Sequence, residues 1–189
     1  MKVLLDANVL YPVPVRDILL SLADRKLFQA KWSADINNEW VRNLLFKRQD
    51  IRAEDLARTV DAMNRAFPDA NTDQYQHRIA QLSLPDPNDR HVLAAAIEAD
   101  AELIITFNLK DFPDDILEKH GIEAVHPDNF IEELIQENTD TAFDAFEQQL
   151  ARLRNPPLSR EYVLEKLSQC GLTNTASSLR LPGSHYSII

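Results

Sequence analysis

The sequence predicts an α/β fold in which a parallel sheet is flanked by helices and followed by a small helical extension. Short apolar runs of strand length, at residues 3–5 and 103–106, alternate with longer stretches whose apolar residues recur at helical spacing. Strands separated by helices predict parallel pairing with right-handed crossovers. From about residue 127 only helical patterns remain. We therefore predict a sheet domain at residues 1–128 and a helical extension at residues 129–189.

The first half of the sheet domain carries start signals for its helices. Pro14 suits the first turn of a helix, where a missing backbone N–H does no harm. Ser33 can cap the next helix, because its hydroxyl can accept a hydrogen bond from a free N–H of the first turn. The predicted elements are a strand at residues 3–5, a helix at 14–23, a strand at 28–32, a helix that follows Ser33, a helix at 53–67 and a short helix around 77–82.

The second half of the sheet domain begins at a strong helix start. Asp86 can cap the helix, Pro87 suits its first position, and Asp89 lies in its first turn near the positive end of the helix dipole. The stretch that follows is rich in alanine, which allows close packing on a sheet. The predicted elements are a helix at residues 89–99, a strand at 103–106, an acidic loop with a short helix at 108–117 and a strand at 122–125.

The extension contains three predicted helices. They cover residues 128–154, residues 159–170, where Gly171 is the expected stop, and residues 173–179. The extension is either an appendage packed on the sheet domain or an arm that binds a partner.

Composition limits the class of protein. The chain has 189 residues, of which 44% are hydrophobic and 26% are charged, as is ordinary for a soluble globular protein. Its single cysteine, Cys170, excludes an intrachain disulfide and a zinc cluster built from cysteines. The first apolar run is too short for a signal peptide, and no stretch approaches the roughly 20 apolar residues of a membrane span. We therefore expect a cytoplasmic protein without a membrane anchor.

The charge is unevenly distributed along the chain. A net charge of −10 excludes a surface that coats nucleic acid generally. Residues 1–65 nevertheless carry more basic than acidic side chains, so the excess of acids lies in the remainder. Within the basic part, Arg16, Lys47 and Arg48 can position a phosphate backbone, or they can belong to solvated helix faces. A substrate with a phosphate backbone would then bind to one face of the protein only.

Four acidic residues occupy positions that an α/β sheet would gather. Asp6 follows the first strand, and the functional groups of open α/β sheets lie at the carboxyl ends of strands. Glu39 lies in a helix near its apolar face, and Asp86 and Asp89 open a later helix. Each also has an ordinary interpretation. Asp6 can form a turn, Glu39 can pair with Arg42, and the other two can simply cap their helix.

Carboxylates gathered in one site repel one another. At 4 Å and an effective dielectric constant near 20, each pair costs about 4 kcal/mol. The fold must then protonate them or bind a cation, and a site of oxygen ligands alone suits Mg²⁺ or Mn²⁺. Asn108 and Asp111 follow the strand at residues 103–106, as Asp6 follows the first strand, so Asp111 is either a further acid of the site or a turn residue. The pattern predicts a metal-dependent enzyme that acts on phosphate esters.

These segments resemble the motifs of a PIN domain, and specifically of the VapC-type toxin ribonucleases. The resembling pieces are residues 3–10 around Asp6, Glu39 in its helix, residues 86–96, and residues 101–112. They stand in the order of the family and cover residues 1 to about 128. The resemblance implies a PIN-like twisted parallel sheet flanked by helices.

The resemblance also implies roles for individual residues. Asp6, Glu39 and Asp89 match the first acid, the helical glutamate and the third acid of the family, so they would be the catalytic residues. Relatives place Asp where this chain has Asn108, which would instead help to position a metal-bound water or the substrate. The implied metal ligands are Asp6, Glu39, Asp86, Asp89 and Asp111.

The function implied by the resemblance is hydrolysis of RNA phosphodiesters by a Mg²⁺- or Mn²⁺-dependent endoribonuclease, the toxin of a toxin–antitoxin pair. Its partners would be an RNA substrate, an antitoxin protein and, as a further option, a second copy of the chain.

Three other functions stay open. A degenerate PIN domain would bind RNA without cleaving it, because Asn108 supplies no charge. A phosphatase would use Asp6 as its nucleophile, although the chain lacks the second Asp that such enzymes have two residues later. A receiver-like module is disfavoured, because Lys110 lies in a loop rather than directly after a strand.

Overall fold

The structure is a computed structural model, and it describes residues 1–154 and 156–180. Residues 181–189 of the predicted extension lie outside the described residues. The contacts divide the chain into two compact units, of which the second combines an early segment with the C-terminal region. The first unit is formed by Met1–Tyr11 and Phe28–His126, and the second by Pro12–Leu27 together with the chain from Pro127 onward.

The first unit is built on a four-stranded parallel sheet with the strand order β2-β1-β3-β4. The strands are β1 (Lys2–Leu5), β2 (Gln29–Lys31), β3 (Leu103–Ile105) and β4 (Glu123–Val125). The central strands β1 and β3 are apolar on both faces, as parallel strands covered on both sides must be. Their register pairs Leu5 with Ile105, so the next residues, Asp6 and Thr106, meet at the carboxyl edge of the sheet.

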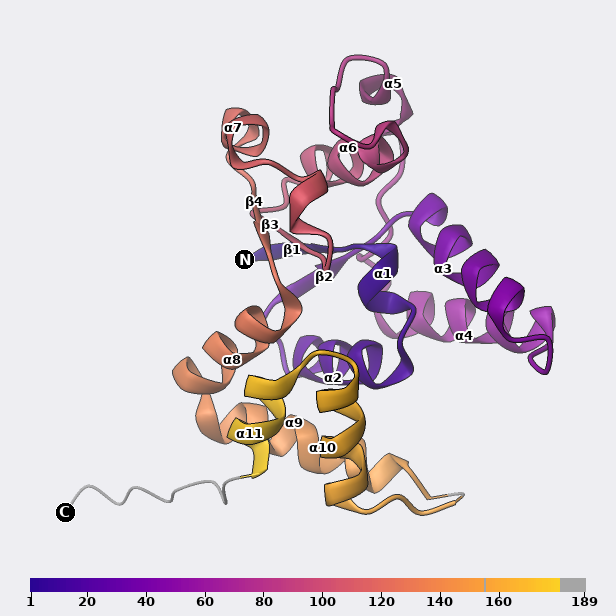
Figure 1. Cartoon of the computed structure of the whole chain (residues 1–189), viewed down its shortest axis with the longest axis vertical. Coiled ribbons are helices and arrows are strands. Elements are labelled where there is room, and N and C mark those ends of the chain that lie inside the picture. Colours follow the sequence, from indigo (N-terminus) through magenta and orange to yellow (C-terminus); the bar gives the residue numbers. More distant parts are fainter. Residues whose placement is uncertain (155, 181–189) are drawn as a thin grey trace. The chain divides into compact units, whose positions relative to one another are not determined.

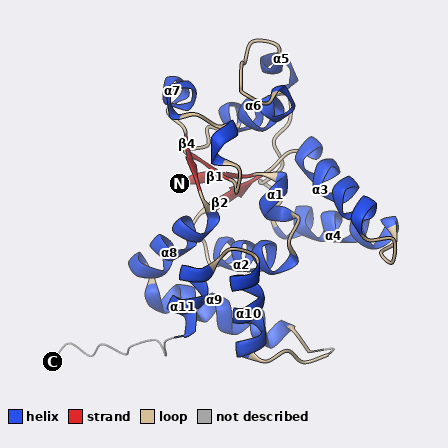
Figure 2. Cartoon of the chain, in the orientation of Figure 1, coloured by secondary structure: helices blue, strands red, loops and turns tan. Residues whose placement is uncertain are grey.

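Helices of the first unit flank this sheet, which confirms the predicted fold class (Figure 2). The alanine-rich helix α6 contacts β1 and β3, and its residues 92–96 are fully buried. Ser33 caps α3 as predicted, since its hydroxyl accepts a hydrogen bond from the N–H of Ile36. The α-helices of this unit are α1 (Ala7–Leu10), α3 (Ala34–Lys47), α4 (Ala53–Ala66), α5 (Gln76–Ile79), α6 (Arg90–Glu98) and α7 (Asp114–Leu117). The 3-10 helices are η1 (Pro87–Asp89), η2 (Leu109–Asp111) and η3 (Glu118–His120).

Helix α1 lies where the sequence predicts only a turn and a loop. Asp6 is its N-cap and accepts a hydrogen bond from the N–H of Ala7. Val9 is fully buried, so the short helix is stabilised by packing rather than by its own length. The site residue Asp6 therefore has a second duty as a helix cap.

The second unit is a group of helices. Helix α2 contacts α9 and α10, while α11 contacts α8 and α10. Its helices, labelled in Figure 1, are α2 (Val13–Asp24), α8 (Pro127–Glu137), α9 (Thr139–Arg152), α10 (Arg160–Gln169) and α11 (Thr173–Arg180). No helix within the described residues is long and apolar enough to cross a membrane.

The single helix predicted at residues 128–154 is two helices in the structure. The break falls at Asn138, whose backbone leaves the helical region with φ −135° and ψ 47°. Asparagine favours such positions because its side chain competes for backbone hydrogen bonds. The break allows α8 and α9 to pack against each other, which one straight helix could not do.

Candidate active site

Asp6 is held at the end of β1 by three hydrogen bonds. The residue is only 5% exposed. Its Oδ1 accepts from the N–H of Ala7 at 2.6 Å, and its Oδ2 accepts from Asn8 Nδ2 at 2.6 Å and from Thr106 Oγ1 at 2.7 Å. Burial is the main cause that raises the pKa of Asp6 to about 6; the hydrogen bond from Thr106 opposes the rise, and the charge of Glu39 adds to it.

Thr106 and Asn8 connect Asp6 to the end of β3. Thr106 is fully buried, and its Oγ1 also accepts from Asn8 Nδ2 at 2.8 Å and from the N–H of Asn108 at 3.0 Å. Asn8 Oδ1 accepts from the N–H of Phe107 at 3.0 Å. Asn8 is absent from the predicted site because Asp6-Ala7-Asn8 on its own indicates a local turn. Only the strand register reveals that it reaches across the sheet.

Replacing Thr106 by valine tests this network. Thr106→Val keeps the shape but removes one of the two donors to Asp6 Oδ2 and leaves the N–H of Asn108 without its partner, so we expect a loss of about 2 kcal/mol in the free energy of unfolding. Urea unfolding measures this loss. Thr59→Val in α4 is the matched control, because the Thr59 hydroxyl donates only to the carbonyl of Asp55 in its own helix. Equal effects of the two substitutions would contradict a special role for Thr106.

Glu39 projects from α3 and pairs with His91 of α6. Its Oε2 lies 3.2 Å from His91 Nε2. Burial lowers the pKa of His91, but the hydrogen bond and the charge of Glu39, with smaller contributions from Asp35 and Asp6, outweigh burial and leave this pKa raised. The other ring nitrogen, Nδ1, is buried and has no hydrogen-bond partner among the described residues. His91 thus acts as a partial counter-charge for Glu39.

Asp89, at the end of η1, is affected by the charge of every other acid that is predicted for the site. Its pKa is raised to about 7, mainly by burial and then by the charges of four acids. In decreasing order of effect, these are Asp6, Asp86, Asp111 and Glu39. The charges of the other four proposed metal ligands therefore all act on Asp89, although no three acidic, His or Cys side chains of the described residues form a ligand set.

Two of these acids also have local structural roles. Asp86 caps η1, since its Oδ1 accepts from the N–H of Asn88 at 2.8 Å. Asp111 accepts a hydrogen bond from the side-chain amide of Asn108. Asn108 thus holds Asp111 in the loop that follows β3, beside the position where relatives have Asp.

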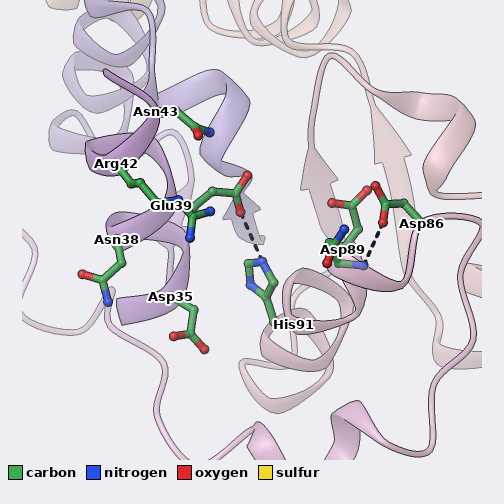
Figure 3. Close-up of a pocket in the computed structure, with 9 residues that line it drawn as sticks. Asp35, Asn38, Glu39, Arg42, Asn43, Asp86, Asp89 and His91 are labelled. Carbon is green, nitrogen blue, oxygen red and sulfur yellow. Dashed lines mark hydrogen bonds and ion pairs between the residues drawn. The ribbon is translucent and has the colours of Figure 1, made fainter. Parts of the chain in front are cut away.

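A cleft of about 710 Å³ opens between α3 and the start of α6. Figure 3 shows Asp35, Glu39 and Arg42 of α3 on one side and Asp86 and Asp89 on the other, with His91 between them. The remaining lining residues are Asn38, Asn43 and Asn88. An acidic cleft of this kind attracts cations and repels phosphates unless a cation is present.

The donor set fits a divalent cation in its chemistry. Carboxylate oxygens are the ligands that Mg²⁺ and Mn²⁺ prefer. The pKa values of Asp6 and Asp89 are raised mainly by burial and further by the charges of neighbouring acids, and a bound cation would favour the ionised form of both groups. Across the described ranges, no three Asp, Glu, His or Cys side chains already form a ligand set. Glu39 would have to give up its bond to His91, and Asp6 would have to share an oxygen that Asn8 and Thr106 now engage.

Comparison with models of known protein families identifies the family of this chain. The family model described as the PIN domain matches residues 2–110, which is more than half of the chain. The chain belongs to the PIN-domain family. The model described as the VapC50 C-terminal domain matches residues 127–181, after the PIN domain.

One curated relative supports this assignment over a short stretch. A protein of Mycobacterium tuberculosis (strain ATCC 25618 / H37Rv) named "Putative ribonuclease VapC50" is 60% identical over 43 residues, which are 23% of this chain and 25% of that protein. The match thus spans a quarter of the length of the relative. No solved structure matches the chain.

The basic residues predicted to position substrate are dispersed. Lys47 of the PIN domain lies over the ring of Tyr11, with Nζ 5.4 Å from its centroid. Arg48 is engaged by Asp50 through two hydrogen bonds of 2.8 and 2.7 Å. Arg16 is buried in α2 of the second unit, and burial lowers its pKa. Arg42 is the basic residue that lines the cleft, and it is absent from the predicted set.

Proposed function

We propose that this PIN domain is a Mg²⁺- or Mn²⁺-dependent endoribonuclease that hydrolyses RNA phosphodiesters. The observation that carries the proposal is the position of the acids: Asp6 lies at the carboxyl edge of the sheet, and Glu39, Asp86 and Asp89 line one cleft. Burial and the charges of the other four acids together raise the pKa of Asp89. A protein that gathers acids from separate segments at the carboxyl edge of a sheet has a strong reason to neutralise them with a cation.

The proposed ligands are Asp6, Glu39 and Asp89, with Asp86 and Asp111 as accessory acids. When bound, the metal would lower the pKa of a water molecule and stabilise negative charge on the scissile phosphate. Asn8 and Thr106 orient Asp6 by holding Oδ2 between them. His91 holds Glu39 through Oε2, and its raised pKa allows it to keep a proton at Nε2 until a stronger counter-charge arrives. Asn108, Lys47, Arg48 and Arg16 stay proposals for positioning the substrate.

Burial favours hydrolysis by water over attack by Asp6. A nucleophilic aspartate needs an oxygen open to the substrate, but both oxygens of Asp6 accept hydrogen bonds and the residue is 5% exposed. Asn108 itself carries no charge, but its side-chain amide binds the carboxylate of Asp111, so the loop after β3 still supplies a charged group. These two observations make the phosphatase and the non-cleaving PIN domain the weaker alternatives.

We further propose that the chain is the toxin of a toxin–antitoxin pair that acts in the cytoplasm, with an antitoxin protein as its partner and a homodimer as a further assembly. The matches to the PIN domain and to the VapC50 C-terminal domain support this proposal. Induced expression in a bacterial host should arrest growth, and co-expression of the small protein encoded by the neighbouring reading frame should restore it.

The direct test of the nuclease is its metal dependence. We expect the purified chain to cleave single-stranded RNA with Mg²⁺ or Mn²⁺, to stop when EDTA is added and to resume when the metal is restored in excess. Gel electrophoresis of end-labelled RNA separates internal cleavage from digestion at the ends. Undiminished cleavage in EDTA would exclude the proposed mechanism.

A further inference from the structure

The face of α3 that lines the cleft continues beyond it to Phe46. The lining residues of this helix are Asp35, Asn38, Glu39, Arg42 and Asn43. Phe46 follows Arg42 by four residues and Asn43 by three, so helical spacing places it on the same face. The opposite face carries Ile36, Trp40 and Leu44, which are buried.

Phe46 is 85% exposed, more than any other large hydrophobic side chain in the described residues. A phenylalanine left in water forgoes the favourable free energy of burying its ring. Neighbouring side chains do not shield it, and the α3 helix ends one residue later, at Lys47. An aromatic ring in this position is suited to contact a ligand that lies in the cleft.

The charge of α3 changes sign along this face. Asp35 and Glu39 are acidic, while Arg42, the next residue of this face, is basic. Arg42 is exposed and forms no hydrogen bond or ion pair with a described residue, although two acids lie on its own helix face. Glu39, Arg42 and Phe46 span about 10 Å along the helix at 1.5 Å per residue. A polyanion leaving the metal site would therefore meet a guanidinium first and an aromatic ring next.

We propose that Arg42 and Phe46 form a docking track for single-stranded RNA, in which Arg42 binds a phosphate beside the cleavage site and Phe46 stacks on an adjacent unpaired base. The track rests on the proposed nuclease function and assigns it two positioning residues. Base stacking on an exposed aromatic ring beside a basic side chain is how proteins hold single strands without reading their sequence. An exposed guanidinium beside an exposed aromatic ring favours RNA, which carries both phosphates and bases, over an apolar protein partner.

Binding measurements without cleavage test the track. The probe is a labelled oligoadenylate of about 12 nucleotides, within the usual range of site sizes, beside an oligomer of the same length that has the ribose-phosphate backbone but no bases. All variants are made in the full chain with Asp89→Asn, which removes the cleavage activity, and are measured with Mg²⁺ present, so that a cation offsets the acidic charge of the cleft. We expect Phe46→Leu to raise the Kd for oligoadenylate roughly tenfold and to leave the Kd for the abasic oligomer unchanged.

Arg42→Gln should weaken binding of both oligomers. Because a phosphate contact releases counterions, this substitution should also make the slope of log Kd against log salt concentration shallower by about 0.7. The matched control is Arg65→Gln, which removes the same charge from an exposed residue of α4 and should leave the slope unchanged. Phe46→Leu should leave the slope unchanged as well, because it removes no charge.

A fluorescent variant reports on stacking itself. Phe46→Trp introduces an exposed indole into a chain whose own Trp32 and Trp40 are fully buried. Oligoadenylate should quench this indole and the abasic oligomer should not, while Tyr162→Trp in α10, at another exposed aromatic position, should respond to neither.

The outcomes separate this inference from the nuclease proposal. If the chain binds oligoadenylate through Arg42 and Phe46 but cleaves no RNA with any metal, the track stands and the nuclease does not. Cleavage by a chain whose Arg42→Gln and Phe46→Leu variants bind RNA as the parent does would overturn the track alone. The track is also overturned if the parent binds neither oligomer, or if Phe46→Leu changes only the oligomeric state in sedimentation, which would make this face a protein interface.

Discussion

Asp89→Asn is expected to abolish RNA cleavage and, at the same time, to make the protein more stable. Loss of a ligand that a metal needs removes several kcal/mol of transition-state stabilisation, so the rate should fall by about 1,000-fold or more. The stability gain has a separate cause. An asparagine side chain has nearly the same shape as that of Asp89 but carries no charge, so the substitution removes the cost of burying a charge and, in addition, the repulsion from Asp6, Asp86, Asp111 and Glu39.

The sign of the stability effect follows from the direction of the pKa shift. Folding raises the pKa of Asp89 from 3.8 to about 7, so the folded protein binds a proton that the unfolded chain has lost. The ionised form of Asp89 therefore lowers the free energy of unfolding by its full amount above pH 7 and by a part of it between pH 7 and 4. Below pH 4 it has no effect. Asp89 keeps contact with solvent, which screens the repulsion, and we expect a gain of about 1–2 kcal/mol for Asp89→Asn at pH 8.

Urea unfolding in EDTA at pH 8 and pH 5.5 measures the gain, which should be smaller at the lower pH. The control is Asp61→Asn, because Asp61 is exposed in α4 and its charge is not among those that act on Asp89. That variant should cleave RNA and unfold as the parent does. A destabilised Asp89→Asn variant that still cleaves RNA would show that this carboxylate is a structural helix start and not part of the site.

The sheet and the position of Asp6 at its edge could be predicted because they depend on local patterns. A short apolar run predicts a buried strand, and parallel strands share a carboxyl edge, so a polar residue after each strand is expected there. The structure confirms the sheet and places Asp6 and Thr106 at that edge. The cap Ser33 was equally accessible, since a capping signal lies within a few residues of the hydrogen bond that it predicts.

The pairings of the site could not be predicted, because they depend on register and packing. Glu39 and His91 are far apart in the sequence, and the pattern of neither helix indicates that their side chains meet. Asn8 joins the site only because β1 and β3 align Leu5 with Ile105. Arg42 is interpreted as a surface partner of Glu39, whereas the structure places it on the cleft.

The division of the chain into two units could not be predicted from the sequence for a similar reason. Apolar spacing in α2 predicts a helix with a buried face, but it does not tell which partner covers that face. In the structure α2 packs with α9 and α10, so an early segment belongs to the C-terminal unit. Arg25 and Asp144 form an ion pair of 2.6 Å within this unit, between segments that are distant in the sequence.

Binding of Mn²⁺ is expected to release more than one proton at pH 6 and almost none at pH 8. A cation binds the ionised carboxylates, so every proton held by a ligand must leave. With pKa values raised to about 6 and about 7, Asp6 is half protonated and Asp89 mostly protonated at pH 6, whereas at pH 8 both are ionised. Because the two groups interact, they titrate as a pair rather than as separate sites. His91 adds to the release, since a cation on Glu39 removes the charge that raises the pKa of His91.

Calorimetric titration in buffers with different ionisation enthalpies counts these protons. The apparent affinity for Mn²⁺ and the rate of RNA cleavage should both rise about tenfold per pH unit between pH 6 and 7 and level off above pH 7.5, because one further carboxylate must be ionised over that interval. Asp89→Asn provides the matched comparison, because it should release fewer protons at pH 6 and bind the ion more weakly at every pH. Proton release that is equal at pH 6 and pH 8 would show that Asp6 and Asp89 do not hold the ion together, and the acidic cleft would then need another counter-charge.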